Sequence, residues 1–185
     1  MGKEYAEIDK HLKAWIDRQH VFFVATAPTD PGGLINCSPK GLDCLRITGS
    51  RQLAYVDTGG SGIETVAHLK DNGRITVMMC AFDGPPKIFR FYGKGHVIEP
   101  HEKGFTDMLA EFPTLPAARN IIVIDVERII DSCGYGVPRY EFQRHRDSLG
   151  NYFSKQSEAD ILAYRNDHNR ESLDGLAGLA FPNDD

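Results

Sequence analysis

The residues with the clearest capacity for chemistry lie in a glycine-rich turn, residues 58–64 (TGGSGIE), which follows the apolar run of residues 53–56. Ser61 has the side chain of a helix N-cap, and Glu64, three residues later, completes the pattern of a capping box. Free backbone N–H groups at a helix start, in a turn with three glycines, let an anion approach the main chain closely. With the Ser61 and Thr65 hydroxyls as further donors, the turn predicts a phosphate site. The alternative is a capped helix that binds nothing, and the charge of Glu64 favours this alternative unless its carboxylate points away.

Two further segments carry basic residues that suit an anionic or electron-rich ligand. In NCSPKG (residues 36–41), the Ser38 hydroxyl can donate to a heteroatom and Lys40 can supply a positive charge. The alternative there is a turn with a solvated lysine. In KIFRFYGKGHVI, Lys87 and Arg90 are three residues apart, so on a strand they point to opposite faces. Arg90 needs a partner or a ligand if it points inward, and otherwise it lies on the solvent face between two phenylalanines.

The cysteines and histidines show no spacing typical of a metal site, because the four cysteines form no C-x-x-C pair and the seven histidines are dispersed. Cys80, in an apolar run, is predicted to be an inert core thiol. Cys133 has no nearby histidine to activate it, so a buried thiol is favoured over a nucleophile. In SCGYGVP (residues 132–138), two glycines flank Tyr135, which suits stacking on a flat ligand or, equally, a tight turn with a surface tyrosine.

These candidate residues must be positioned by a predominantly β scaffold. About six strands are predicted, in residues 21–28, 34–47, 52–57, 74–82, 87–98 and 120–131. Helical patterns cover residues 8–19, 61–72 and 101–112. Short turns, without a helix after nearly every strand, favour a closed or partly closed antiparallel β-barrel over a doubly wound sheet. Pro39 and Gly41 predict a bulge or an edge strand in the second of these runs.

The chain has 185 residues, which predicts a single domain. Within it, residues 1–138 are expected to form the barrel with its N-terminal helix. Residues 139–185 contain one amphipathic helical pattern and a loop-like tail, with too few apolar residues for a core of their own. This C-terminal extension is therefore expected to pack on the barrel or on a partner subunit.

Composition excludes several classes of function. The formal net charge of −5 argues against a nucleic-acid binder that relies on a basic surface. No segment approaches the ~20 apolar residues of a membrane span, and the charged N-terminus lacks the apolar region of a secretory signal. Scattered cysteines without such a signal suggest a cytoplasmic setting. Neither a P-loop nor a dinucleotide-binding glycine fingerprint occurs.

The chain resembles the pyridoxamine 5'-phosphate oxidase-like family over most of residues 21–98, in the order of four segments: VFFVATAP, INCSPKG, LAYVDTGGSGIETVAHLKDNGRITVMM and KIFRFYGKGHV. SCGYGVP and the late NRESLDGLAGL are similar to a flavin-nucleotide-binding branch of that family. The resemblance implies an FMN-binding split β-barrel, antiparallel and Greek-key-like, with flanking helices and a C-terminal helical extension. It also implies a homodimer with FMN at the subunit interface.

Nine positions are implied as cofactor-binding by this resemblance. They are Ser38, Pro39 and Lys40 along the flavin; Asp57 and Thr58 beside the ring or the ribityl chain; Ser61, Gly62 and Thr65 near the phosphate; and Lys87, close to an Arg-Gln pair of the oxidases. The chain departs from the oxidases at the phosphate turn, where they have basic residues and this chain has Gly62 and Ile63. Four basic residues are candidates for the missing charge: Lys40, Arg74, Lys87 and Arg90.

The oxidases' C-terminal basic signature for substrate phosphate is also not recognisable. We therefore expect an FMN-dependent oxidoreductase with a small-molecule substrate other than pyridoxamine phosphate. Because the flavin carries the redox chemistry, no side chain is assigned a catalytic role. The main alternative is a non-catalytic barrel that binds or senses with flavin, haem or deazaflavin, and a carrier of small ligands without a cofactor is a third.

Overall fold

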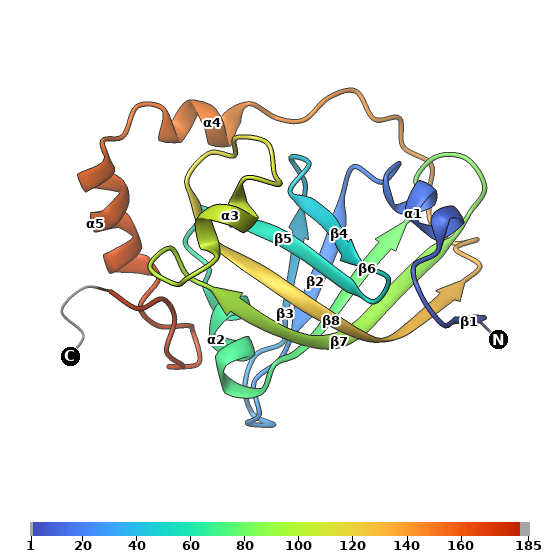
Figure 1. Ribbon diagram of the computed structural model, residues 1–185, viewed down its shortest axis with the longest axis horizontal. Coiled ribbons are helices and arrows are strands. Elements are labelled where there is room, and N and C mark those ends of the chain that lie inside the picture. Colours follow the sequence, from blue (N-terminus) through green and yellow to red (C-terminus); the bar gives the residue numbers. More distant parts are fainter. Residues whose placement is uncertain (1, 182–185) are drawn as a thin grey trace.

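The computed structural model describes residues 2–181, which are built around one antiparallel sheet of eight strands (Figure 1). The strands are β1 (Glu4–Tyr5), β2 (Phe22–Thr26), β3 (Asn36–Lys40), β4 (Leu45–Gly49), β5 (Gln52–Thr58), β6 (Arg74–Cys80), β7 (Ile88–Ile98) and β8 (Ala118–Ser132). Their order is β3-β2-β6-β7-β8-β5-β4, and β1 pairs with β8. The two ends of this path, β3 and β4, are consecutive in the chain but do not pair with one another, which makes the barrel a split one. The expected fold class is confirmed.

The long strands β7 and β8 form the centre of the sheet. Along β7 the side chains alternate, with Phe89 and Phe91 buried in the core. A bulge interrupts the register with β8 between Tyr92 and Gly93. A Cβ on Gly93 would lie 2.1 Å from the carbonyl oxygen of Asp125, so only glycine fits this close approach. Residues 87–98, predicted as one strand, therefore contain the continuous strand β7, which is bent at this bulge.

The 34–47 run forms two short strands, β3 and β4. Pro39 lies within β3 opposite Phe23 of β2. Since β3 pairs only with β2, it is an edge strand, as the proline predicts. In the turn after β3, Leu42 and Asp43 have φ of 63° and 55°. These left-handed conformations bend the chain sharply directly after Lys40.

Helices cover the two ends and one side of the barrel (Figure 1). They are α1 (Lys10–Ile16), α2 (Glu64–Asn72), α3 (Phe105–Leu109), α4 (Ser148–Phe153) and α5 (Glu158–His168). The carboxylate of Asp9 caps α1 by accepting from the N–H groups of His11 and Leu12. The described residues contain no helix of the length and apolar character that a membrane crossing requires.

The predicted capping box at the start of α2 is wrong. The N-cap residue is Ile63, no side chain caps the helix, and the helix begins at Glu64. The reason is tertiary, because side chains from distant segments bind the carbonyl oxygens of the preceding turn. The helix predicted over residues 101–112 is also shorter, since only Phe105–Leu109 are helical.

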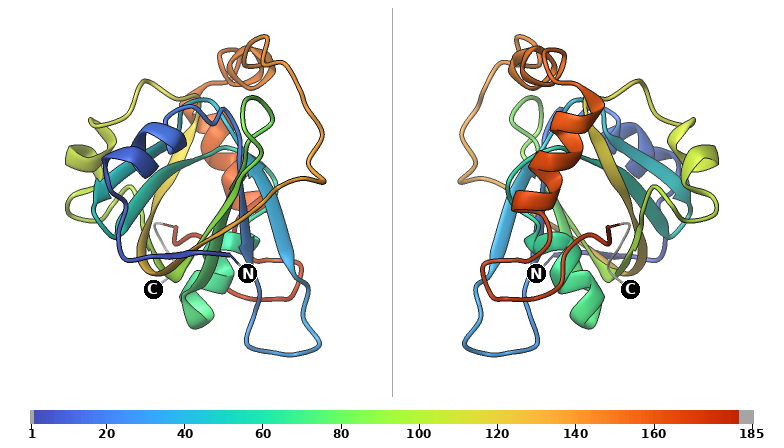
Figure 2. Two further views of the ribbon diagram at one scale, coloured as in Figure 1. Left: turned by 90° about the vertical axis from the view of Figure 1, so that its right-hand side faces the viewer. Right: turned by 90° about the vertical axis from the view of Figure 1, so that its left-hand side faces the viewer.

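The C-terminal extension contains two helices, α4 and α5, where one was expected. Figure 1 shows the chain leaving β8, crossing to the opposite end of the barrel and forming both helices there. No residue of α5 is buried. Other residues anchor the extension. Phe153, at the end of α4, is buried, and so are Asn169 and Leu179 in the tail after α5. In Figure 2 the tail returns beside α2.

Candidate functional site

A buried cluster of charged side chains connects β3, β5 and β8. Asp57, near the end of β5, is 1% exposed. Its Oδ1 accepts from Lys40 Nζ at 2.8 Å, and its Oδ2 accepts from Arg119 Nε at 2.8 Å. Asn120 Nδ2 donates to the same Oδ2 at 3.3 Å. The cluster thus holds two cations and one carboxylate, and Lys40, whose side chain is 20% exposed, is the cation that reaches solvent.

The two cations keep Asp57 ionised in this position. Burial by itself raises the pKa of the carboxyl, because a charged group is poorly solvated inside the protein. The charges of Lys40 and Arg119, and the hydrogen bonds that they donate, act in the opposite direction and hold the pKa of Asp57 below its usual range. The carboxylate is therefore a fixed negative charge that positions both basic side chains.

The glycine-rich turn before α2 is held in place by hydrogen bonds from two side chains to its backbone carbonyl oxygens. Arg119 donates to the oxygen of Gly60 from Nη1 at 2.8 Å and to that of Gly62 from Nη2 at 2.6 Å. Asn169 Nδ2 donates to the oxygens of Gly60 at 3.0 Å and Ser61 at 3.3 Å. No backbone N–H of Ser61, Gly62 or Ile63 donates to another described residue. The turn therefore keeps donors free for a ligand.

A chain of polar side chains lies beside the first turn of α2. Ser38 Oγ donates to Asn36 Oδ1 at 2.9 Å, and Asn36 Nδ2 donates to Thr65 Oγ1 at 2.9 Å. Asn36 Nδ2 also lies 3.2 Å from Thr26 Oγ1, which contacts the buried His68 Nδ1 at 3.0 Å. These bonds tie the edge strand β3 to the helix start. They bring Ser38 and Thr65, 27 positions apart in sequence, into one network.

Eight of the nine predicted positions therefore lie in one region. Lys40 and Asp57 form its ion pair, Ser38 and Thr65 its polar chain, and Pro39 and Thr58 belong to the strands that carry them. Ser61 and Gly62 are exposed in the turn.

Lys87 is the exception. Its Nζ lies 2.9 Å from Asp131 Oδ2, near the end of β8 opposite to Arg119. Twelve residues of strand separate Asp131 from Arg119, about 40 Å of extended chain. Of the other basic candidates for the missing charge, Arg90 donates to Ser132 on the outer face, and Arg74 donates to Asn72 and the carbonyl of Pro28. Lys40 is the only one of the four that joins the cluster.

Sequence reasoning missed Arg119, Asn120 and Asn169. Arg119 and Asn120 directly precede the apolar run of β8, and a polar pair that becomes fully buried is a signal of a polar site. Asn169 begins the NRESLDGLAGL segment, which carried part of the resemblance without an assigned role. Their contacts with residues 57–62 span 57 to 109 positions, and no local pattern reveals such a separation.

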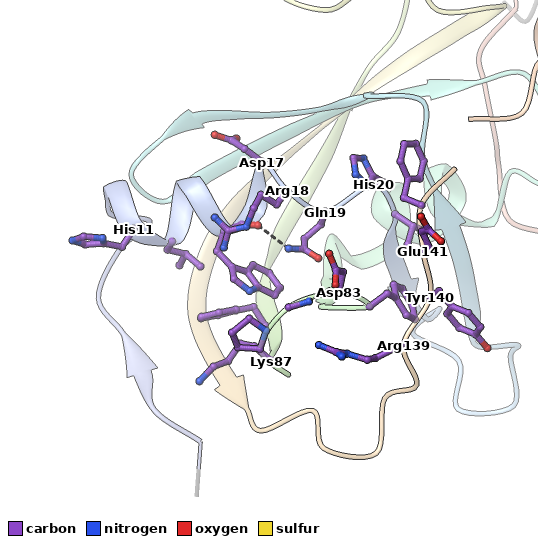
Figure 3. A pocket seen from close by; sticks show the side chains of 18 of the residues that line it. His11, Asp17, Arg18, Gln19, His20, Asp83, Lys87, Arg139, Tyr140 and Glu141 are labelled. Atoms are coloured by element: carbon purple, nitrogen blue, oxygen red, sulfur yellow. Dashed lines mark hydrogen bonds between the residues drawn. The ribbon is translucent and has the colours of Figure 1, made fainter. Parts of the chain in front are cut away.

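A cavity of about 1480 Å³ lies apart from the cluster, between α1, the β6–β7 turn and the segment after β8. Figure 3 shows Arg18 and Gln19 from the turn after α1, and Arg139 and Tyr140 from the segment after β8, around it. Aromatic side chains line much of it, and Lys87 belongs to its wall. Lys87, predicted to bind the cofactor, is therefore part of this cavity and not of the cluster around Asp57.

The cysteines divide into two pairs. Cys44 and Cys80 are buried, which confirms the prediction for Cys80, and burial raises the pKa of Cys44 to about 12. Cys133 is exposed, so its prediction as a buried thiol is wrong, because the strand ends one residue earlier. Tyr135 is 82% exposed beside it, as in the surface-turn alternative. No group of three or more potential metal-ligating side chains occurs among residues 2–181.

Comparisons with known proteins agree with this architecture. A family model described as pyridoxamine 5'-phosphate oxidase matches residues 8–133. The pyridoxamine 5'-phosphate oxidase family protein ustO of Aspergillus flavus is 36% identical over 193 aligned residues, covering 95% of this chain and 77% of that protein.

Among solved structures, HupZ from Group A Streptococcus superposes with a TM-score of 0.54 and 20% identity. The superposition covers 68% of this chain and 94% of HupZ. At this identity, the likeness concerns the fold.

Proposed function

Because the chain belongs to the pyridoxamine 5'-phosphate oxidase family, we propose that it binds the flavin nucleotide FMN and acts as a flavin-dependent oxidoreductase on a small molecule. The observation that carries the proposal is the glycine-rich turn before α2. Its carbonyl oxygens are bound from inside, while the N–H groups of Ser61, Gly62 and Ile63 have no described partner. A phosphate group is the ligand that such a turn accepts best.

The residues around the turn fit a flavin nucleotide. Lys40 supplies a partly exposed positive charge, held in place by Asp57. Ser38 and Thr65 supply hydroxyl groups on the adjoining strand and helix. Neutral donors therefore replace the basic residues that the oxidases have in this turn. This suits a chain with a net charge of −5, because binding depends on local N–H groups more than on the overall field.

Bound flavin supplies the electron transfer itself. In this proposal the chain's own residues bind and orient the nucleotide: the turn holds the phosphate, and Lys40 lies beside the flavin. The ionised Asp57 carboxylate, whose pKa is held low, holds the Lys40 side chain in place through the 2.8 Å ion pair. No side chain of the cluster is assigned a proton-transfer role.

We further propose a homodimer with the cofactor at the subunit interface. Lys87 belongs to the opposite end of β8 within one protomer, so it can contribute to a flavin site only from the partner protomer. Size-exclusion chromatography with light scattering tests the dimer, which should have twice the mass of the chain. In the dimer, Lys87→Ala should weaken FMN binding, and unchanged binding would remove Lys87 from the proposed site.

The central experiment is the visible spectrum of the purified protein, before and after incubation with FMN and removal of free cofactor. Retained flavin absorption supports the proposal, and a protein that remains colourless after incubation overturns it. Lys40→Ala should weaken FMN binding about tenfold, the value of one charge-assisted contact. Lys103→Ala, which changes an exposed lysine away from the turn, is the matched control.

Turnover separates the two classes of function. Reduction of the bound flavin by NADH or NADPH, followed by reoxidation with candidate acceptors faster than free FMN, supports an oxidoreductase. Bound flavin without turnover above that of free FMN supports the non-catalytic binding or sensing barrel instead.

A further inference from the structure

The C-terminal extension takes part in the phosphate turn itself. Asn169, in the tail after α5, is fully buried. Its Nδ2 donates to the carbonyl oxygens of Gly60 and Ser61, and its Oδ1 accepts from Arg119 Nη1 at 3.0 Å. One amide side chain thus connects the turn to the arginine that holds Gly62. Three successive carbonyl oxygens, those of residues 60–62, are bound by this pair of side chains.

These bonds set the direction of the N–H groups. In a trans peptide unit, the N–H of one residue points opposite to the C=O of the residue before it. With the oxygens of residues 60–62 directed at Arg119 and Asn169, the N–H groups of residues 61–63 point away from them. The same three N–H groups lack a partner among the described residues. The hydrogen bonds from Arg119 and Asn169 to the carbonyl oxygens therefore fix the direction in which these N–H groups point.

The tail, residues 169–180, is fixed in the position that lets Asn169 bind the turn. A Cβ on Gly178 would lie 2.9 Å from a side-chain carbon of Ile63, the N-cap residue of α2, so the tail packs directly on the helix start. The N–H of Leu179 donates to the carbonyl of Asn169 at 2.9 Å, and the Leu179 side chain is buried. The N–H of Ala180 donates to Glu99 Oε2 at 2.9 Å. These contacts hold Asn169 from the C-terminal side.

Four of the five N–H groups of Arg119 donate to these partners, and the side chain is buried rather than exposed to a ligand. It is 4% exposed and donates to Asp57, Gly60, Gly62 and Asn169. A buried guanidinium without its acceptors is costly, so the arginine and the turn fix one another.

We propose that Arg119 and Asn169 are positioning residues for the phosphate of the bound nucleotide, and that the C-terminal extension is therefore a required part of the binding site. The proposal rests on the proposed function. By holding the carbonyl oxygens of residues 60–62 inward, the pair presents the N–H groups of the exposed residues Ser61 and Gly62 to the phosphate. Phosphate binding and docking of residues 169–180 then favour one another by thermodynamic linkage.

The test compares FMN with riboflavin, which lacks the phosphate, by titration of flavin fluorescence. Asn169→Leu keeps the approximate shape and adds no charge, but removes the donor to Gly60 and Ser61. Wild type should bind FMN more tightly than riboflavin, and Asn169→Leu should reduce that preference about tenfold or more, since each N–H bond to phosphate is charge-assisted. Asn166→Ala, which changes an exposed side chain of α5, is the matched control and should keep the wild-type preference.

The outcomes distinguish the inference from the function on which it rests. A wild-type protein that prefers FMN, with an Asn169→Leu variant that keeps the same preference, overturns the inference alone. A wild-type protein that binds neither flavin overturns the proposed function together with it.

A second measurement uses wild type only and so does not depend on the folding of a variant. Saturating FMN should slow amide hydrogen exchange in residues 169–180 more than saturating riboflavin does. Equal protection by the two flavins overturns the inference.

Discussion

Lys40 at the end of β3 and Asp57 near the end of β5 form an ion pair with 2.8 Å between Nζ and Oδ1. This pair directly connects the edge strand of the split barrel to the opposite half of the sheet. It also places a partly exposed ammonium group next to a fully buried carboxylate, which Arg119 holds from the other side. Both the fold and the proposed site depend on the charge of this carboxylate.

Acid should therefore destabilise the protein through Asp57. Its folded-state pKa is below the ordinary value near 3.9, so the ionised form stabilises the fold above that value. This contribution is lost as the pH falls through about 4 towards the lower folded-state pKa. The free energy of unfolding, measured with urea between about pH 6 and pH 3, should decrease over that range.

Asp57→Asn should lower the free energy of unfolding near neutral pH by about 3–5 kcal/mol, because Lys40 and Arg119 then lose their counter-charge. The substitution should also make the free energy of unfolding less dependent on pH in the acidic range. Asp107→Asn, which changes an exposed carboxylate of α3, should do neither. An Asp57→Asn protein as stable as wild type would contradict the role of this carboxylate.

Glu64→Gln should strengthen FMN binding. A Cβ on Gly62 would come within 2.8 Å of Glu64 Oε2, so the carboxylate lies against the turn and repels a phosphate there. Removing the charge should raise the affinity for FMN by up to about tenfold and change that for riboflavin less. The gain should shrink at high salt. Glu158→Gln, at the start of α5, is the control, and weaker FMN binding by Glu64→Gln would argue against phosphate at the turn.

Thiol reactivity should follow burial. Cys37 and Cys133 are exposed, whereas burial raises the pKa of Cys44 to about 12 and also raises that of Cys80. Two of the four thiols should therefore react rapidly with a disulfide reagent in the native protein, and the other two only in denaturant. Cys133→Ser should remove one rapid equivalent. Four rapid equivalents in the native state would be inconsistent with this burial.

Gly178→Ala should loosen the tail. The added Cβ would lie 2.2 Å from the carbonyl oxygen of Asn169, a backbone atom that cannot move aside without displacing the tail. We expect a loss of about 1–3 kcal/mol and faster proteolysis within residues 169–181. Gly136→Ala, whose Cβ meets nothing within 4 Å, should behave as wild type. A Gly178→Ala tail as protease-resistant as that of wild type would disagree with the packing on Ile63.

The local sequence pattern correctly predicted the parts of this protein whose structure depends on residues close to one another in the chain. Strands β5 to β8 follow from their apolar runs, and Pro39 correctly indicates an edge strand. By contrast, β1 was not predicted, because its two residues become a strand only by pairing with Ile129 and Ile130 of β8. The capping box failed for a related reason, since bonds from Arg119 and Asn169 override the local preference of Ser61.

From sequence alone, the chain could be assigned to an antiparallel split barrel, and most of its proposed cofactor site could be named. Eight of those nine positions lie in β3, β5, the turn and α2, within residues 36–72, and the order of these elements in the chain was visible. Only the tertiary structure decided which side chains complete the site. It brought Arg119 from β8 and Asn169 from the tail to the same turn, and it put Lys87 at the far end of β8. The physical reason is that buried polar groups must find partners, and those partners are set by packing between distant segments and not by spacing along the chain.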